Sequence, residues 1–321
     1  MPSRPASLKP GRPGRKTVIF IVGPTGVGKT GLAIKLAGRI GGEIVSCDSM
    51  QVYKSMPILS QAPTRKERAL ARHHLVSVLD PSRECSVALF RKMAVKAIGS
   101  IAARGKTPIV TGGTGLYAKA LIDGLFPAPA ADLKFRRRME AFASRNGRKR
   151  LWSKLRRIDP ASAGSIHPND TRRVIRALEI FHSTGKTMTE LKSETKGLGD
   201  NYDIRIFGMT RPRGSINKAI DERVDKMLRS GLLAEVKRLK KRRLSRTAAA
   251  ALGLKEISRH LDGECDLDEA RAELKMNTRR FAKRQMTWFG ADGRIVWFDM
   301  SRTGESKAVS EIAAQVKELK M

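Results

Sequence analysis

The most constraining feature of this chain is the stretch GPTGVGKT at residues 23–30, which follows an apolar run and precedes a helical pattern. It fits the spacing Gly-x-x-x-x-Gly-Lys-Thr, in which glycines let successive backbone N–H groups turn toward an anion. Residues 17–22 are almost all β-branched or aromatic and predict a buried parallel strand. A helix is expected from Lys29 to Gly41, and its amino end adds a positive dipole. The segment is therefore predicted to be a phosphate-binding loop.

The loop alone leaves open whether its phosphate belongs to a nucleotide or to another diphosphate. Lys29 is expected to reach terminal phosphate oxygens, and the hydroxyl of Thr30 suits Mg²⁺, which prefers oxygen ligands. An NTPase would normally add a strand that ends in Asp, but the strand predicted within residues 107–115 ends in glycines. A second GKT at residues 185–187 has Ile180 where the full motif needs glycine, so it predicts only a helix end followed by a loop.

Strands and helices alternate along the first part of the chain. A second strand is expected at residues 43–48, ending on Asp48, and a helix at residues 86–104. This order predicts parallel βαβ units, and hence an α/β fold with a P-loop NTPase-like parallel sheet flanked by helices. Because ligands lie beyond the carboxyl ends of parallel strands, the loop, Asp48 and residues 112–114 are expected to converge there.

The composition changes after residue 130 and predicts a helical insertion domain. Residues 132–182 are expected to be helical and 184–203 to form a loop. A returning strand is expected at residues 204–209 and further helices at residues 214–289. The predicted divisions are a disordered basic leader at 1–16, a P-loop α/β core at 17–130, a basic helical insertion at 131–195, and a core completion with a helical C-terminal part at 196–321.

The charge of the chain favours a polyanionic partner. It has 64 Lys and Arg against 31 Asp and Glu, a formal net charge of +33. Such a field attracts polyanions, and nucleic acid is the expected class. No apolar run is long enough to span a membrane, and three widely separated cysteines predict neither a disulfide framework nor a zinc site. We therefore expect a cytoplasmic protein with no membrane partner.

Six segments in order closely resemble those of one enzyme family, the tRNA dimethylallyltransferases. They are GPTGVGKT, DSMQVY, GGTGLY, IHPNDTRRVIRALEI, RVDKMLRSGLLAEV and FAKRQMTWF, and the likeness extends from about residue 18 to 299. The resemblance implies a prenyltransferase that moves a dimethylallyl group from dimethylallyl diphosphate to N6 of adenosine 37, 3′-adjacent to the anticodon of tRNA. It implies Mg²⁺ as cofactor, no consumption of ATP, the anticodon stem-loop as partner, and diphosphate as second product. A monomer is expected.

The resemblance also implies roles for single residues. Asp48 would be the general base, and Arg223 would stabilise the leaving diphosphate with the loop and Mg²⁺. The residues implied in diphosphate binding are Gly23, Pro24, Thr25, Gly26, Val27, Gly28, Lys29 and Thr30, with Thr30 as metal ligand. The chemistry of such a reaction agrees with these roles, because a poorly nucleophilic adenine amine needs a base and a stabilised leaving group. The alternatives are an Asp48 that only caps a helix or holds Mg²⁺ through water, and an exposed Arg223 paired with Asp221 or Glu222.

On the RNA side the resemblance implies a second set of residues. These are Asp48, Ser49, Met50, Gln51, Thr114, Arg136, Arg172, Arg173, Val174, Ile175 and Arg176. Arg172 and Arg176 stand four apart and share a helix face. The basic run at residues 236–246 is equally consistent with a solvated helix face and with a defined RNA site. For the aromatic residues of FAKRQMTWF, core packing is favoured over stacking on bases.

The chain departs from the family pattern at four positions, and three other functions compete. Ala62, Asn217, Ala219 and Gly290 stand where the family usually has Lys, Tyr, Arg and Arg. Rival functions are prenyl transfer to a free adenine nucleotide, phosphoryl transfer by a P-loop kinase, and RNA binding by a GTPase-like protein. The long basic helical segments argue against the first, and no guanine-specific Asn/Thr-Lys-x-Asp motif supports the last.

Overall fold

The computed structural model describes residues 14–126 and 129–317, which form two compact units. An α/β unit contains the chain up to Ile122 and from Leu198 onward, and a helical unit contains Asp123–Gly197. Most of the predicted leader, residues 1–13, lies outside the described residues. Lys16 donates from Nζ to the carbonyl of Ala102, and its own carbonyl accepts from Asp203 N, so the chain is anchored just before the first strand.

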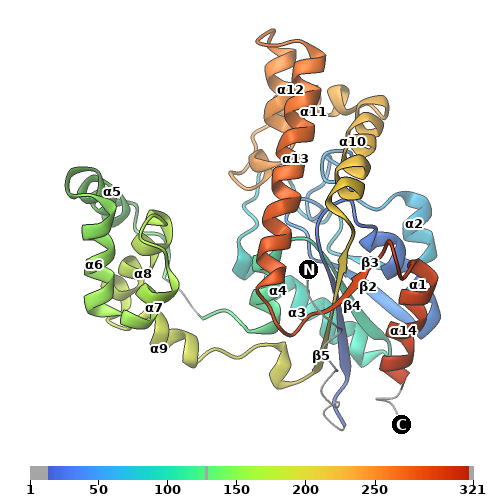
Figure 1. Ribbon diagram of the computed structural model, residues 1–321, viewed down its shortest axis with the longest axis horizontal. Helices are drawn as coiled ribbons and strands as arrows, with labels where there is room; N and C mark the ends of the chain where they lie inside the picture. Colours follow the sequence, from blue (N-terminus) through green and yellow to red (C-terminus); the bar gives the residue numbers. More distant parts are fainter. Residues whose placement is uncertain (1–13, 127–128, 318–321) are drawn as a thin grey trace. The chain divides into compact units, whose positions relative to one another are not determined.

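A six-stranded parallel sheet with the order β3-β2-β4-β1-β5-β6 is the framework of the α/β unit (Figure 1). The strands are β1 (Thr17–Val22), β2 (Gly42–Ser46), β3 (His73–His74), β4 (Thr107–Gly112), β5 (Asp203–Thr210) and β6 (Val296–Asp299). The four predicted strands are confirmed as β1, β2, β4 and β5, although β2 ends two residues before Asp48. The short strands β3 and β6 were not predicted.

The side chains of β1 alternate between two apolar clusters, one on each face of the sheet. Val18, Phe20 and Val22 lie in one cluster, and Ile19 and Ile21 lie in the other. The helices α1 (Lys29–Ile40) and α14 (Glu305–Lys317) cover the second face, where they pack against each other. The helices α3 (Val87–Ala103) and α4 (Gly115–Ile122) cover the first face. The expected helices after Lys29 and Ser86 are confirmed, whereas α14 was not predicted.

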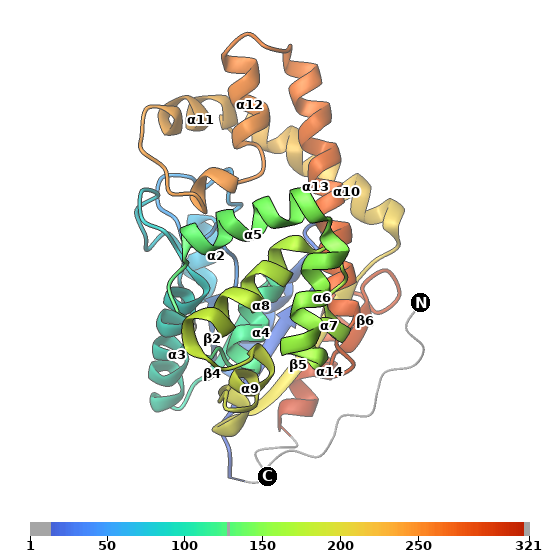
Figure 2. The ribbon, with the colours of Figure 1, turned by 90° about the vertical axis from the view of Figure 1, so that its left-hand side faces the viewer.

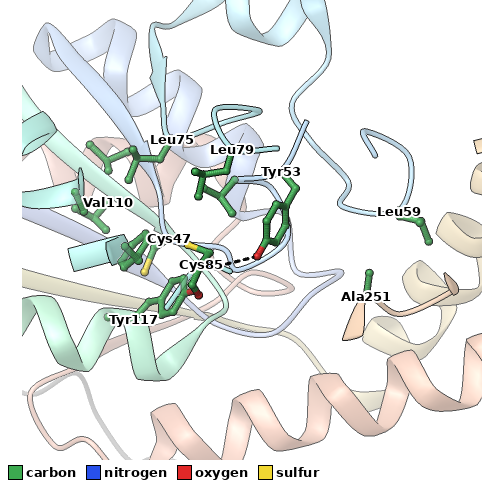
Figure 3. Close-up of a cluster of buried hydrophobic side chains, with 14 of the residues drawn as sticks. Cys47, Tyr53, Leu59, Leu75, Leu79, Cys85, Val110, Tyr117 and Ala251 are labelled. Atoms are coloured by element: carbon green, nitrogen blue, oxygen red, sulfur yellow. Dashed lines mark hydrogen bonds between the residues drawn. The ribbon is translucent and has the colours of Figure 1, made fainter. Parts of the chain in front are cut away.

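The first cluster continues into the segment that follows β2 (Figure 3). Tyr53 is fully buried, and its hydroxyl accepts a hydrogen bond from the backbone N–H of Cys85 at 3.1 Å. The same hydroxyl contacts the hydroxyl of Thr247. Glu235 of α11 (Leu232–Lys240) accepts from the backbone N–H groups of Ile58 and Leu59 at 3.0 and 2.8 Å. The segment after Asp48 is thus held from several sides.

The predicted helical stretch at 214–289 is confirmed as α10 (Arg213–Arg229), α11, α12 (Leu254–Leu261) and α13 (Leu267–Gly290). The unit also contains α2 (Arg65–Leu70) and two 3₁₀ turns, η1 (Leu198–Asp200) and η2 (Ala248–Ala250). The buried side of α13 repeats every three or four residues, as expected for a helix with one face in the core. Its members are Ala270, Leu274, Thr278, Ala282, Gln285 and Phe289.

The helical unit has its own small core, and its helices are visible in Figure 2. They are α5 (Leu133–Asn146), α6 (Arg148–Ile158), α7 (Pro160–Ser165), α8 (Thr171–Thr184) and α9 (Met188–Ser193). Helix at 132–182 is confirmed, with Gly185 as the left-handed cap of α8. The loop predicted at 184–203 is wrong in part, because α9 lies within it. Thr187 and Glu190 form a capping box there, a local signal that sequence analysis overlooked.

Among the described residues, the structure contains no helix with the length and apolar character needed to cross a bilayer.

Candidate active site

The loop between β1 and α1 has the backbone shape that its glycines predicted. Gly23, Gly26 and Gly28 have φ values of 143°, 84° and 97°, which side chains other than glycine rarely adopt. A Cβ atom on Gly23 would lie 2.4 Å from the carbonyl oxygen of Met209 in β5, so the loop starts in close contact with the neighbouring strand. The turn leads directly into the amino end of α1 at Lys29, which suits an anion.

Lys29 is held by the loop itself, and no carboxylate within residues 14–126 and 129–317 forms an ion pair with it. Its Nζ donates to the carbonyl oxygen of Pro24 at 2.7 Å. The pKa of Lys29 is lowered to about 7, chiefly by burial and also by the positive charge of Arg223, while Asp48 acts in the opposite direction. An ammonium group with a depressed pKa favours any ligand that brings negative charge to it.

Asp48 lies immediately beyond β2 and is oriented by the backbone that follows it. Its Oδ1 accepts from the N–H groups of Met50 at 2.8 Å and Gln51 at 3.3 Å. Burial raises the pKa of Asp48, and these two bonds together with Lys29 and Arg223 offset only part of the rise. A carboxylate with a raised pKa is a stronger base than a solvated one, so Asp48 is suited to accept a proton.

Arg223 of α10 points at the phosphate loop. Its Nη1 donates to Oγ1 of Thr25 at 2.8 Å. Burial lowers the pKa of Arg223 and Asp48 opposes this. Asp221, the partner proposed for an exposed Arg223, instead binds Arg279 of α13. Because Arg223 is only partly exposed and donates to Thr25, the alternative of an exposed arginine paired along its own helix is wrong.

The carboxyl ends of β2, β4 and β1 converge as predicted. Cys47 N donates to the carbonyl of Thr111 at 2.7 Å, and Thr114 N donates to the carbonyl of Cys47 at 3.3 Å. The hydroxyl of Thr114 accepts from Ser49 N at 3.1 Å. A Cβ atom on Gly112 would lie 2.1 Å from the carbonyl oxygen of Cys47, so glycine lets the two strand ends meet. Thr114 is thereby placed beside the segment of Asp48.

One residue of this site was missed by the sequence analysis. Gln285 of α13 is buried, and its Oε1 accepts from Thr25 N at 2.8 Å while its Nε2 donates to the carbonyl of Gly113 at 2.9 Å. In the stretch FAKRQMTWF, the predictions concern the family resemblance and the aromatic residues but not Gln285. The overlooked signal was a polar residue on the apolar face of α13, between Ala282 and Phe289.

The site fits a metal ion that is carried by a diphosphate better than one held by protein ligands alone. No group of three or more His, Cys, Asp or Glu side chains suited to a metal lies within 14–126 and 129–317. Thr30, in the first turn of α1, offers one hydroxyl close to the loop. Mg²⁺ commonly keeps several waters and takes its remaining ligands from substrate phosphates, so this sparse donor set is compatible with it.

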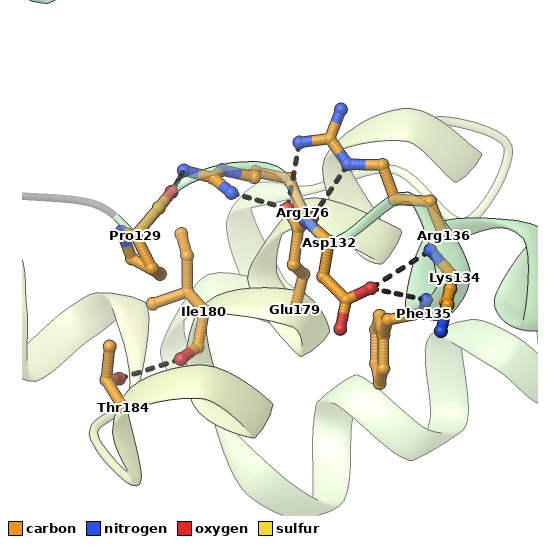
Figure 4. Close-up of polar contacts among 9 residues, drawn as sticks. All are labelled: Pro129, Asp132, Lys134, Phe135, Arg136, Arg176, Glu179, Ile180 and Thr184. Atoms are coloured by element: carbon orange, nitrogen blue, oxygen red, sulfur yellow. Dashed lines mark hydrogen bonds and ion pairs between the residues drawn. The ribbon is translucent and has the colours of Figure 1, made fainter.

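In the helical unit, two of the predicted tRNA-binding arginines bind a buried carboxylate (Figure 4). Glu179 is 0% exposed and accepts from Arg136 Nη2 at 2.8 Å, from Arg176, and from Asp132 N at 2.7 Å. Burial acts to raise the pKa of Glu179, but these bonds outweigh it and hold the pKa below its usual value. Arg176 also donates to the carbonyl of Pro129 at 3.0 Å.

The remaining predicted residues of α8 divide between core and surface. Val174 and Ile175 are buried in the core of the helical unit, so their side chains cannot contact RNA, and this part of the prediction is corrected. The period of the amphipathic helix α8 determines which residues of the motif are exposed to solvent. Arg173 is exposed and pairs with Asp170 at 3.3 Å, and Arg172 is exposed.

The other basic and aromatic candidates are divided in the same way. In the run 236–246, Lys240, Arg242 and Arg246 pair with Asp262, Asp80 and Glu84 respectively. Core packing is confirmed for Phe289, which is 4% exposed. It is wrong for Trp288, which is 38% exposed.

The sequence of this chain resembles known proteins over most of its length. The model of the IPP transferase family matches residues 51–292, and that of the isopentenyl transferase family matches residues 16–78. A tRNA dimethylallyltransferase of Halothermothrix orenii is 46% identical over 94% of this chain and 92% of its own length. That of Bacillus subtilis is 44% identical over 89% of this chain and 92% of its own length.

Two solved structures resemble the fold closely enough to be compared in the same way. The tRNA isopentenylpyrophosphate transferase of Bacillus halodurans has a TM-score of 0.70 and 39% identity, covering 95% of this chain and 98% of that chain. A eukaryotic dimethylallyltransferase, described as acting on tRNA, has a TM-score of 0.78 and 31% identity, covering 94% of this chain and 80% of that chain.

Proposed function

Because this chain belongs to the tRNA dimethylallyltransferase family, we propose that it transfers the dimethylallyl group of dimethylallyl diphosphate to N6 of adenosine 37 in tRNA. The observation that carries the mechanism is a carboxylate of raised pKa, Asp48, near the cationic groups Lys29 and Arg223 at one edge of the sheet. Asp48 can accept the proton of the attacking amine, and Lys29 and Arg223 can bind the diphosphate that is displaced.

The reaction balances with these groups. The N6 nitrogen forms a bond to the allylic C1, the C1–O bond breaks, and its electron pair leaves with the diphosphate. The N6 proton passes to the carboxylate of Asp48, whose orientation is set by Met50 N and Gln51 N. The products are N6-dimethylallyladenosine and diphosphate.

The leaving diphosphate would be bound by the loop at residues 23–30. Backbone N–H groups at the start of α1 can face it, and Lys29 can move from the carbonyl of Pro24 to a phosphate oxygen. Arg223 approaches the same place through Thr25. Preorganised donors of this kind stabilise charge as it develops on a leaving group.

Mg²⁺ is proposed to enter with the diphosphate, with Thr30 as its protein ligand. When bound, it would neutralise charge on the phosphate oxygens. The protein would contribute the hydroxyl of Thr30 to the ion, while Lys29 and Arg223 would bind diphosphate oxygens directly.

On the acceptor side, the target base must leave the stacked anticodon loop to reach a carboxylate at the end of a strand. We propose that Thr114 and residues 49–51 contact the extruded nucleotide, because they adjoin Asp48. Arg172 and Arg173 are proposed to contact tRNA phosphates from the surface of α8. Arg136 and Arg176 are assigned a structural role through Glu179. We further propose that the enzyme acts as a cytoplasmic monomer.

A transfer assay tests the proposed function. Wild-type protein is incubated with isotopically labelled dimethylallyl diphosphate, Mg²⁺ and tRNA that lacks the modification, and the label is located by mass spectrometry of the digested RNA. The matched control is the same tRNA with guanosine at position 37. Label on adenosine 37 alone is expected.

Two other outcomes would contradict the proposal. Faster labelling of AMP than of tRNA would indicate an enzyme acting on free nucleotides. Substrate-stimulated phosphate release from ATP, without prenyl transfer, would indicate a kinase.

A further inference from the structure

We infer that Gln285 is a positioning residue that fixes the phosphate loop against the turn carrying Thr114, and so sets the spacing between leaving diphosphate and accepting adenosine. The inference rests on the proposed function and adds a role for a residue on α13. Gln285 is 260 positions from Thr25 and 172 from Gly113, so it joins distant parts of the chain.

The chemistry of the bridge requires a carboxamide. Toward the loop the side chain must accept, because Thr25 presents an N–H group at 2.8 Å. Toward the turn it must donate, because Gly113 presents a carbonyl at 2.9 Å. The amide group of a glutamine offers both, an acceptor on Oε1 and a donor on Nε2. Gln285 is 6% exposed, so its loss would leave two backbone groups without partners in a largely dry place.

The turn after β4 packs closely against α13. A Cβ atom on Gly113 would lie 2.1 Å from Nε2 of Gln285, and one on Gly115 would lie 2.1 Å from Cδ1 of Trp288. Gln285 and Trp288 are three residues apart and therefore share a face of the helix. Two of the glycines in GGTG thus allow close contact with this end of α13.

The same bridge determines which atoms of Thr25 are available to bind the diphosphate. Its N–H group is occupied by Gln285, and its Oγ1 accepts from Arg223. A threonine hydroxyl that accepts a bond still has its own proton to donate. Thr25 is therefore held at two points by α13 and α10, with its hydroxyl rather than its amide available to a phosphate oxygen.

The two helices that hold Thr25 are themselves joined by ion pairs. Asp221 of α10 binds Arg279 of α13, and Asp225 of α10 binds Arg271 and Lys275 of α13. Thr25 on the donor side and Gly113, next to Thr114, on the acceptor side are thereby joined to two helices that are linked by ion pairs. Displacement of reacting groups by about 1 Å can cost about 100-fold in rate, so loosening this tie should slow the chemical step.

The test compares three variants by steady-state kinetics in which tRNA is varied at saturating dimethylallyl diphosphate. Gln285→Met removes both hydrogen bonds at similar side-chain volume. Gln285→Glu keeps an acceptor for Thr25 N but, when ionised, has no donor for Gly113; it also serves if the methionine variant does not fold. Thr278→Val is the matched control, because Thr278 is buried on the same helix and its hydroxyl donates to the carbonyl of Leu274, one turn earlier on that helix.

For both Gln285 variants we expect kcat to fall by about 10- to 100-fold while KM for tRNA changes by less than about 3-fold. Thr278→Val should leave kcat within about 2-fold. A merely structural role would lower the melting temperature without changing kcat of the folded enzyme, and either that result or a folded Gln285 variant with near-normal kcat would overturn the inference. Failure of the wild type to label tRNA would instead overturn the proposed function.

Discussion

Asp48 in the α/β unit and Glu179 in the helical unit are both carboxylates near two cationic side chains, yet their surroundings differ. Glu179 binds Arg136 and Arg176 directly, and its pKa is lowered. Near Asp48, Lys29 bonds to a carbonyl and Arg223 to a hydroxyl, and the pKa of Asp48 is raised. Charges that are held apart from each other can serve a substrate, whereas charges that neutralise each other hold a fold together.

The largest effect is expected from a substitution of Asp48, the carboxylate proposed to act in catalysis. Asp48→Asn keeps an Oδ1 acceptor for Met50 N and Gln51 N but removes the base. We expect kcat to fall by about 100- to 10,000-fold, with tRNA affinity nearly unchanged. Single-turnover transfer and filter binding measure the two quantities. A near-normal rate would remove Asp48 from the mechanism.

The matched change in the other unit is Glu179→Gln. It leaves two buried or half-buried arginines without a negative charge, which should destabilise the helical unit by about 2–4 kcal/mol. Hydrogen exchange of α5 and α8 would report the loss directly. Binding of dimethylallyl diphosphate should be unchanged, since the loop belongs to the α/β unit. Unchanged exchange protection would show that Glu179 is not a structural anchor.

A third carboxylate, Glu43 in β2, also binds cationic side chains directly, as Glu179 does, and its contribution to stability can be tested by changing the pH. Burial acts to raise its pKa, but His74, Lys106 and Arg104 outweigh this and bring the pKa to about 2. Since the folded-state pKa lies below the ordinary 4.5, Glu43 stabilises the fold above about pH 4.5, and this contribution is lost as the pH falls toward about 2.

Glu43→Gln should therefore lower the free energy of unfolding at pH 7 by about 1–3 kcal/mol. The difference from wild type should shrink as the pH is lowered from about 4.5, because Glu43 then becomes protonated in the unfolded wild type while it stays ionised in the folded protein. Urea unfolding at several pH values measures this difference. A difference that stays constant down to pH 3 would contradict the assigned pKa.

The smallest expected effect separates two arginines of α8. Arg172→Ala should weaken tRNA binding by about 2- to 10-fold and reduce the salt dependence by about one phosphate contact, with no loss of stability. Arg176→Ala should destabilise the helical unit instead, because Arg176 holds Glu179 and the carbonyl of Pro129. Binding titrations at several salt concentrations, paired with thermal unfolding, distinguish them. Equal behaviour of both variants would contradict the division between surface and anchor.

The sequence was most informative where structure is determined locally. The strand, glycine turn and helix around Lys29 could be predicted, because their conformations depend mainly on the residues in that stretch of sequence. Convergence of Asp48 and Thr114 on that loop followed from the rule that parallel strands end at one edge. The bridge by Gln285 could not be predicted, since its partners are set by the packing of α13.

In the helical unit, composition predicted helices but not what each arginine does. Arg136 and Arg172 look alike in a basic sequence, and only the buried position of Glu179 distinguishes them. The family motif grouped Val174 and Ile175 with the arginines, although the helical period turns them into the core. The short helix α9 was missed because its six residues carry a cap signal but little periodicity.

The most direct test of the account is a crystal structure with an unreactive donor analogue and an anticodon stem-loop bound together. We predict that the diphosphate lies against the loop at residues 23–30 and that N6 of adenosine 37 lies about 2.6–3.2 Å from the carboxylate of Asp48. A diphosphate bound elsewhere, or an adenine amine that faces a different group, would contradict it.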